Sequence, residues 1–315
     1  MSKSEQLAFV FPGQGSQKIG MLSEIAEAYP LVKDTFDEAT AVLGYDLWSL
    51  VQSGSQEELN MTEVTQPALL VSSVALWRVW LQQGGVKPAW LAGHSLGEWS
   101  ALVAAGVIAF ADAIRLVRAR GQYMQEAVPA GVGAMAAIIG LSDELVEQAC
   151  VSASSDGEIV SPVNYNSPGQ LVIAGHKAAV EQAMGLCKES GAKRALPLPV
   201  SAPFHTALMK PAAERLAGEI ENTVFSVPEI PVVHNVNAQA ESDPEKIKAL
   251  MIEQIYSAVR WVECVQFLVG EGVNGSVECG PGSVLSGLNR RIHKGLQTFN
   301  TDTIAKLEPS LAELK

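Results

Sequence analysis

The chain has 315 residues, of which 48% are hydrophobic and 18% charged, as is typical of globular enzymes. Its net charge of −12 argues against a general nucleic-acid or membrane-surface protein, because both need an attractive cationic face. No uncharged apolar stretch reaches the ~18 residues of a membrane span, and the apolar run near the N-terminus is too short for a signal peptide, so we expect a soluble, cytoplasmic protein.

Short apolar runs alternate with helical patterns, which is typical of an α/β protein. The elements predicted outside the middle of the chain are strands at 7–11, 89–93, 230–237 and 275–282, and helices at 65–85, 96–110, 110–127 and 246–259.

The middle of the chain follows a different order. The predicted elements there are a strand at 133–140, a helix at 142–150, strands at 158–165 and 171–175, a helix at 176–190 and a strand at 194–200. This β-α-β-β-α-β order is the ferredoxin-like arrangement. We therefore predict a ferredoxin-like subdomain over residues 129–199, inserted into a core formed by residues 1–128 and 200–315.

Cysteines and basic segments give weaker signals. The four cysteines have no metal-ligand spacing, which predicts reduced, mostly buried thiols and no metal site. Two basic segments, 187–195 and 289–295, are candidate docking sites for an acidic partner, although a solvated surface is the simpler explanation of each.

A serine stands between two glycines where a predicted strand meets a predicted helix, in the stretch Gly93-His94-Ser95-Leu96-Gly97. This G-x-S-x-G pattern is typical of a nucleophile elbow, in which glycines allow a sharp turn and the helix N-terminus stabilises an oxyanion. The alternative is a tight glycine turn in which the serine only caps the helix. The strand and helix context favours Ser95 as a nucleophile.

A serine hydroxyl needs a base, and the chain has five histidines. His205 follows a strand and a Pro-Phe corner, where active-site loops emerge, and is the first candidate. His234 lies in a predicted core strand and is the second. The less suitable ones are His94, which diverges from the serine, His176, at a subdomain edge, and His293, among basic residues. No carboxylate obviously orients His205, which is a first indication against a hydrolase.

Two further features leave alternatives open. Helical periodicity places Arg120 at the rim of an apolar face, where an arginine needs an anionic partner: either a glutamate of the fold or a substrate carboxylate. The loop FPGQGSQKIG lacks a nucleotide-binding pattern, because Lys18 occupies the third glycine position. It is either a structural turn or the source of a main-chain amide for an oxyanion.

Several segments together resemble the malonyl-CoA:acyl-carrier-protein transacylase family of bacterial fatty-acid synthesis. They occur in the family's order and extend over the chain to about residue 295; they are FPGQGSQ, GHSLGE, VRARGQYMQEAVP, GAMAAIIGL, VNYNSPGQLVIAGH, KRALPLPVSAPFHTALMKPA and VECGPGSVL. The resemblance implies an α/β hydrolase-like core with a central, mostly parallel sheet and the ferredoxin-like insert.

The resemblance also assigns roles to individual residues. It implies that Ser95 is the nucleophile that holds the malonyl ester and that His205 is the general base and acid. It implies that the main-chain carbonyl of Gln254 holds the imidazole in place of the acid of a triad. The substrate contacts that it implies are Arg120 for the free carboxylate of malonate and the amides of Gln14 and Leu96 for the oxyanion. Phe204 resembles the malonyl-preferring pattern of related acyltransferases.

The implied function is transfer of malonyl from malonyl-CoA to the phosphopantetheine thiol of acyl carrier protein, in a ping-pong reaction without metal or cofactor. We expect these two partners and a monomer. Alternatives on the same elbow are a serine hydrolase or thioesterase, a non-enzymatic scaffold of a larger assembly, and a separate acyltransferase of a polyketide or malonate decarboxylase system.

Overall fold

A five-stranded parallel sheet forms the centre of the larger part of the protein. The computed structural model describes residues 6–200 and 202–314. In the order β7-β2-β1-β8-β9, all neighbouring strands run parallel. The strands are β1 (Leu7–Phe11), β2 (Trp90–Gly93), β7 (Val232–Val233), β8 (Gly275–Glu278) and β9 (Gln297–Asn300).

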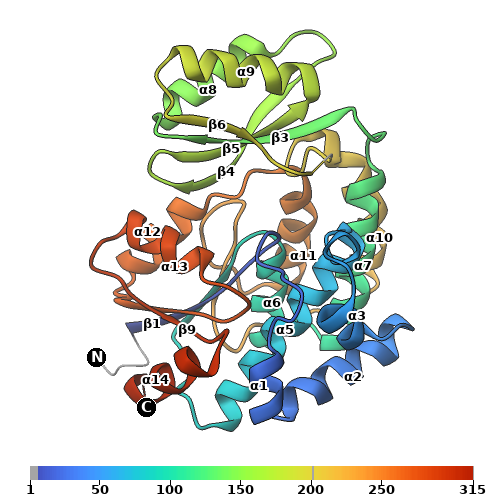
Figure 1. Cartoon of the computed structure of the whole chain (residues 1–315), viewed down its shortest axis with the longest axis vertical. Coiled ribbons are helices and arrows are strands. Elements are labelled where there is room, and N and C mark those ends of the chain that lie inside the picture. Colours follow the sequence, from blue (N-terminus) through green and yellow to red (C-terminus); the bar gives the residue numbers. More distant parts are fainter. Residues whose placement is uncertain (1–5, 201, 315) are drawn as a thin grey trace.

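Helices cover both faces of this sheet (Figure 1). They are α1 (Ser23–Ala28), α2 (Leu31–Leu43), α3 (Leu47–Ser53), α4 (Gln56–Leu59), α5 (Thr62–Gln82), α6 (Leu96–Ala104), α7 (Phe110–Glu126), α10 (Lys210–Glu221), α11 (Pro244–Glu253), α12 (Trp261–Gly270), α13 (Val284–Ile292) and α14 (Ile304–Leu314), with 3₁₀ turns at Ala207–Met209 and Gln254–Tyr256.

Strand β1 shows how the sequence builds the two faces. Successive side chains of a strand point to opposite faces. Leu7, Phe9 and Phe11 belong to the apolar cluster that contains α5, α6 and α7, whereas Ala8 and Val10 belong to the cluster under α12 and α13. Every residue of β1 is buried, as expected for a parallel strand covered on both faces.

Helix α5 is the most apolar long element of the core. Among the described residues it is the one helix long and apolar enough to cross a membrane, but 89% of its most apolar window is buried inside the structure. Its Trp77 and Trp80 rings pack edge-on against Phe9, with centroids 5.2 and 5.1 Å away. It is therefore a core helix packed against the sheet.

A four-stranded antiparallel sheet in the order β4-β5-β3-β6 forms the smaller part. Its elements are β3 (Gly133–Ile139), α8 (Asp143–Ala153), β4 (Val160–Ser167), β5 (Gln170–His176), α9 (Lys177–Glu189) and β6 (Arg194–Pro197). The predicted α/β fold with a ferredoxin-like insert is thus confirmed. The exact limits of residues 129–199 for the subdomain stay a prediction.

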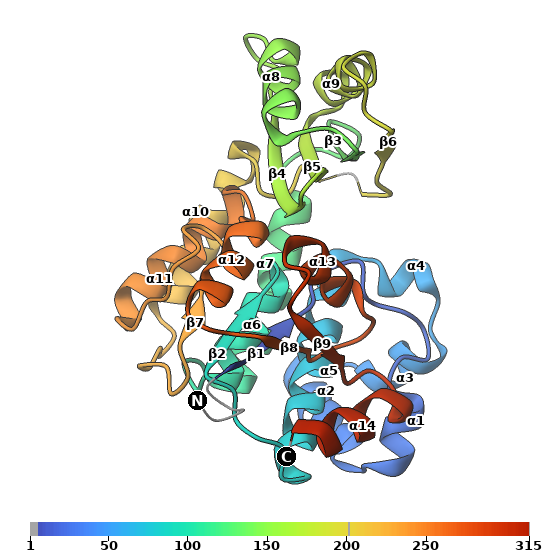
Figure 2. The same ribbon diagram turned by 90° about the vertical axis from the view of Figure 1, so that its left-hand side faces the viewer.

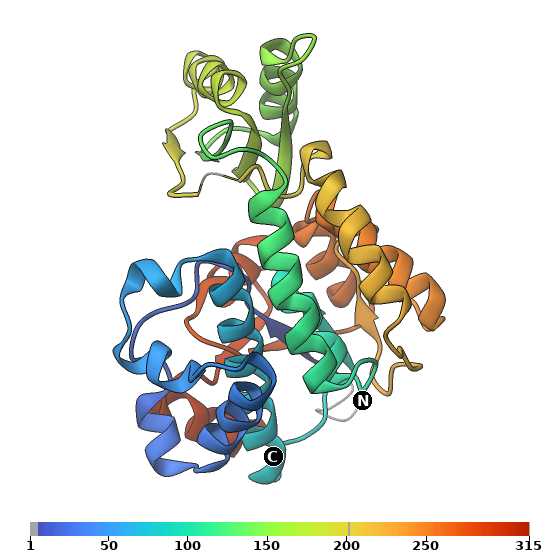
Figure 3. The same cartoon turned by 90° about the vertical axis from the view of Figure 1, so that its right-hand side faces the viewer.

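The two parts meet above the C-terminal end of α7 (Figures 2 and 3). The α8 and α9 helices pack on the far face of the small sheet and form a separate apolar cluster with it. Its strand β4 is tied to the core by main-chain bonds, from the Tyr165 amide to the Val259 carbonyl at 3.0 Å and from the Val259 amide to the Val163 carbonyl at 2.8 Å. These bonds fix one side of the cleft between the two parts.

Several predicted elements are shorter than expected. The strands predicted over 275–282 and 194–200 end at Glu278 and Pro197. The helix predicted over 96–110 ends at Ala104, because Gly106 adopts a left-handed φ of 72° and turns the chain. The strand predicted over 230–237 is reduced to Val232–Val233, an edge strand that pairs with β2. The helix predicted over 246–259 ends at Glu253 and continues as a 3₁₀ turn.

Candidate active site

The turn from β2 to α6 forces Ser95 into an unusual backbone conformation. Its φ is 51° and its ψ is −109°. A Cβ at Gly93 would lie 2.0 Å from the carbonyl carbon of Gly97, and a Cβ at Gly97 would lie 1.9 Å from the Phe11 carbonyl oxygen. Both positions therefore require glycine. The Ser95 hydroxyl makes no capping bond to α6, which contradicts the alternative of a serine that only caps the helix.

The hydroxyl of Ser95 is hydrogen-bonded to His205. Ser95 Oγ lies 2.7 Å from His205 Nε2, and His205 Nδ1 lies 2.9 Å from the main-chain carbonyl oxygen of Gln254. Because a carbonyl can only accept, Nδ1 holds the proton and Nε2 faces the serine as an acceptor. Burial, and next the charge of Arg120, lower the pKa of His205 to about 3. The imidazole is therefore neutral at neutral pH.

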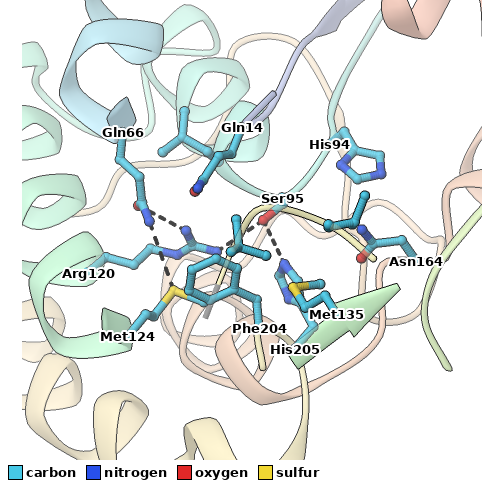
Figure 4. Close-up of a pocket in the computed structure, with 13 residues that line it drawn as sticks. Gln14, Gln66, His94, Ser95, Arg120, Met124, Met135, Asn164, Phe204 and His205 are labelled. Carbon is cyan, nitrogen blue, oxygen red and sulfur yellow. Dashed lines mark hydrogen bonds between the residues drawn. The ribbon is translucent and has the colours of Figure 1, made fainter. Parts of the chain in front are cut away.

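Arg120 lies on the other side of the same hydroxyl (Figure 4). Its guanidinium donates to Gln66 Oε1 at 2.9 Å, to Gln254 Oε1 at 3.0 Å and to Ser95 Oγ at 3.3 Å. The side chain is only 2% exposed. Burial lowers its pKa to about 10, while Glu98 acts in the opposite direction, so the group is charged at neutral pH.

Among the described residues, no glutamate forms an ion pair with Arg120. None of the ion pairs formed within residues 6–200 and 202–314 includes it, and its Nε atom has no hydrogen-bond partner. The expectation of an ion pair with a glutamate of the fold is therefore wrong for direct contact. The guanidinium is therefore free to bind an anionic group that enters the pocket.

The other four histidines have different surroundings. His234 is fully buried, with Nδ1 2.7 Å from Glu98 Oε1. His94 Nε2 lies 2.8 Å from Asn166 Oδ1, and the ring of His176 accepts from a main-chain amide. His293 is exposed at the end of α13. Only His205 is hydrogen-bonded to Ser95 among the described histidines.

Ser95, His205, Arg120 and Gln66 line an open pocket between the core and the subdomain. Gln14 and Leu96 also line this pocket, and Gln14 lies near Ser95 (Figure 4). In the described part of the chain, the main-chain amides of Gln14 and Leu96 donate no hydrogen bond to another protein group. The Ser95 amide, in contrast, donates to Asn235 Oδ1 at 2.7 Å. The pocket also has an apolar wall, formed by Met124, Met135, Leu198, Val200 and Phe204.

The sequence prediction missed four polar residues around the site. Gln66 binds Arg120, Asn235 binds the Ser95 amide, Asn166 binds His94, and Glu98 binds Gln254 at 2.7 Å. A usable signal existed for Glu98, because a charged residue in the apolar helix pattern LGEWSALVA has to be buried with partners. The described residues contain no cluster of three or more potential metal ligands, and the four cysteines are unpaired and buried.

An α/β core with a strained serine bonded to a neutral histidine defines a class of enzymes that act on acyl groups through a serine hydroxyl. The buried arginine beside that serine adds a binding group for an anionic substrate. A family model described as an acyl transferase domain matches residues 8–309. The chain belongs to this acyltransferase family.

Similar proteins cover nearly the whole chain. The malonyl CoA-acyl carrier protein transacylase of Salmonella typhimurium is 58% identical over 308 residues, 98% of this chain and 99% of its own length. The Escherichia coli K12 protein of the same name is 60% identical over 91% of this chain and 93% of its own length.

Solved structures of similar proteins share the fold. The acyl carrier protein S-malonyltransferase of Vibrio cholerae has a TM-score of 0.95 and 60% identity, with 97% of this chain and 99% of that one covered. A malonyl-transacylase in complex with a type II polyketide synthase acyl-carrier protein has a TM-score of 0.96 and 56% identity, with 98% and 99% covered.

Proposed function

We propose that the protein transfers a malonyl group from malonyl-CoA to the phosphopantetheine thiol of acyl carrier protein and so supplies extender units for fatty-acid synthesis. The observation that supports this most is the position of one hydroxyl between a neutral base and a cation. Ser95 Oγ is 2.7 Å from His205 Nε2 and 3.3 Å from Arg120 Nη2. The names of relatives at 58–60% identity agree with this function.

In the first half-reaction, Ser95 Oγ attacks the thioester carbonyl of malonyl-CoA while His205 Nε2 takes its proton. The tetrahedral intermediate carries its negative charge on the former carbonyl oxygen, and the amides of Gln14 and Leu96 donate to it. The C–S bond then breaks, and the imidazolium gives the proton to the departing CoA thiolate. The Gln254 carbonyl accepts from Nδ1 throughout and keeps the imidazole in the required tautomer.

The second half-reaction reverses these roles. The thiol of the carrier protein gives its proton to His205 Nε2 and attacks the malonyl ester of Ser95. The same two amides stabilise the second oxyanion, and the proton returns to Ser95 Oγ as the ester bond breaks. Neither step consumes water or changes an oxidation state, and the second step regenerates the unmodified enzyme.

Arg120 provides the selectivity for a diacid. Its charged guanidinium lies within hydrogen-bond distance of Ser95 Oγ, so a malonyl group on that oxygen can place its free carboxylate against the Nη and Nε donors. A charge-assisted pair of this kind is stronger than a neutral hydrogen bond. An acetyl group has no carboxylate and gains nothing from the arginine.

Incubation with malonyl-CoA labelled in its malonyl group, with and without carrier protein, separates transfer from hydrolysis. With carrier protein present, we expect the label to appear on the carrier. Without it, we expect at most one equivalent of label to be bound to the enzyme and little free malonate to be released. Continuous release of malonate that does not depend on the carrier identifies a hydrolase or thioesterase instead, because water then deacylates the serine.

The carrier protein needs a docking surface near the mouth of the pocket. We place it at the two basic segments, 187–195 and 289–295, because Lys193 and Arg194 are exposed and strand β6, which begins at Arg194, leads to Leu198 on the pocket wall. Arg291 of the second segment donates to Gln170 at the subdomain edge, at 2.6 Å. We further propose a cytoplasmic location and a monomer.

A further inference from the structure

A buried carboxylate lies behind the active site and takes no direct part in the proposed reaction. Glu98, on α6, has an exposed fraction of 0%. One of its oxygens faces His234 Nδ1 at 2.7 Å. The other accepts from the Asn235 amide at 3.1 Å and from Gln254 Nε2 at 2.7 Å. Burying a charged carboxylate costs folding free energy, which its hydrogen bonds offset only in part. We therefore ask what these hydrogen bonds do for the active site.

The two residues held by Glu98 bind both main-chain polar groups of the strained serine. The Ser95 amide donates to Asn235 Oδ1 at 2.7 Å, and the Ser95 carbonyl accepts from Gln254 Nε2 at 3.0 Å. Asn235 Nδ2 also donates to the Gly93 carbonyl at 2.7 Å, two residues before Ser95. A backbone with φ of 51° is unfavourable for serine, so these side chains hold it in a conformation that it does not prefer.

Glu98 also fixes which way the Gln254 amide points. A carboxylate only accepts hydrogen bonds and a guanidinium only donates them. The amide nitrogen of Gln254 must therefore face Glu98, and its oxygen must face Arg120. With a neutral amide in place of Glu98, Arg120 still requires the Gln254 oxygen to face it, but the constraint on the Gln254 nitrogen from Glu98 is lost, because a second amide can either accept or donate.

We propose that Glu98 is a positioning residue for malonyl transfer: it orients Asn235 and Gln254, and these two side chains hold the Ser95 backbone so that its hydroxyl meets His205. The inference rests on the proposed function and deepens it. It explains why a carboxylate is buried one helical turn after the nucleophile although, in the part of the chain that the structure describes, no carboxylate is bonded to the catalytic histidine.

The test compares Glu98→Gln, which keeps the side-chain shape, with Glu278→Gln as a matched control. Glu278 is equally buried and accepts from the amides of Leu285 and Ser286 at 3.1 and 2.7 Å, away from Ser95. Loss of either carboxylate lowers the thermal midpoint. Only Glu98→Gln is expected to lower the single-turnover rate constant of enzyme acylation at saturating malonyl-CoA, by about 10- to 100-fold.

A double-mutant cycle shows whether Glu98 acts through its neighbours. Asn235→Ala removes the bond to the Ser95 amide while Glu98 stays, and must lower the same rate constant even if Glu98→Gln is too unstable to assay. The double variant should lose less of the acylation rate constant than the product of the two single fold-losses, because both substitutions act on one contact. A multiplicative double loss would overturn the proposal.

Two outcomes separate this inference from the proposed function. If the wild-type protein never acquires a malonyl group, the proposed function fails before any variant is compared. If the wild type is acylated and Glu98→Gln keeps its acylation rate constant while losing only thermal stability, like Glu278→Gln, then Glu98 serves the fold alone and the positioning role is wrong.

Discussion

Ser95 and its partner His205 are 110 residues apart in the sequence and meet only in the folded chain. The elbow is a local pattern, so Ser95 and the two glycines follow from five neighbouring residues. The base did not follow from spacing, since His205, after a predicted strand, and His234, within one, were both candidates. Three-dimensional contact separates them: His205 bonds Ser95, and His234 bonds Glu98.

The depressed pKa of His205 predicts how acylation depends on pH. Because burial and the charge of Arg120 lower that pKa from 6.5 to about 3, the imidazole stays a free base as the pH falls through 6.5. We therefore expect kcat/KM for malonyl-CoA to stay nearly level between about pH 8 and 5. A tenfold fall per pH unit below 6.5 would show a base with an ordinary histidine pKa.

The same shift affects stability in a defined direction. In the unfolded chain His205 takes up a proton near pH 6.5, whereas in the folded protein it remains neutral until the pH approaches 3. The unfolded state therefore binds more protons within this window, and His205 makes the free energy of unfolding decrease as the pH falls below 6.5. Acylation at pH 5 is accordingly measured in brief assays.

Arg120→Ala should reduce the preference for malonyl over acetyl. The substitution removes a charged hydrogen-bond pair of roughly 1.5–3 kcal/mol, which corresponds to a fall of about 10- to 150-fold in the ratio of the two kcat/KM values. Arg120→Lys is the control that keeps a positive charge and should lose less. Equal losses of malonyl and acetyl transfer would exclude contact between Arg120 and the substrate carboxylate.

At the scale of elements, the strand–turn–helix unit of the elbow depends on two close backbone approaches. Gly97→Ala would place a Cβ 1.9 Å from the Phe11 carbonyl oxygen, on the central strand. Either β1 or α6 must then move, and we expect a loss of about 3 kcal/mol or more in the free energy of unfolding.

Gly185→Ala in α9 is the matched control, because a Cβ there meets no atom within 4 Å. Alanine should stabilise that helix by about 0.4–1 kcal/mol. Denaturant unfolding of both variants measures the difference. A Gly97→Ala protein as stable as the wild type would contradict the close packing of α6 on the sheet.

Element types were easier to predict than element ends. The ferredoxin-like order followed from alternating strand and helix patterns, and its six elements are present. The end of α6 did not follow, because Gly106 terminates the helix inside an otherwise continuous apolar pattern. Gln66 and Asn235 were missed for another reason: they contact Arg120 and Ser95 across sequence separations of 54 and 140 residues, which no local pattern encodes.

At the scale of the whole molecule, the net charge of −12 repels another acidic protein except at local basic surfaces. Reversing both charges, Lys193→Glu with Arg194→Glu, should raise KM for the carrier protein about tenfold or more at low salt and leave acylation by malonyl-CoA unchanged. The salt dependence of carrier transfer should weaken in the same variant. Unchanged carrier kinetics would remove segment 187–195 from the docking surface.

Covalent storage of the malonyl group on Ser95 is the central claim, and intact-mass spectrometry tests it most directly. After mixing with malonyl-CoA, the wild-type protein should gain a single malonyl adduct, which disappears when carrier protein is added and reappears on its phosphopantetheine thiol. Ser95→Ala should gain none. A malonyl adduct on Ser95→Ala, or transfer by the wild type without any adduct, would contradict the account.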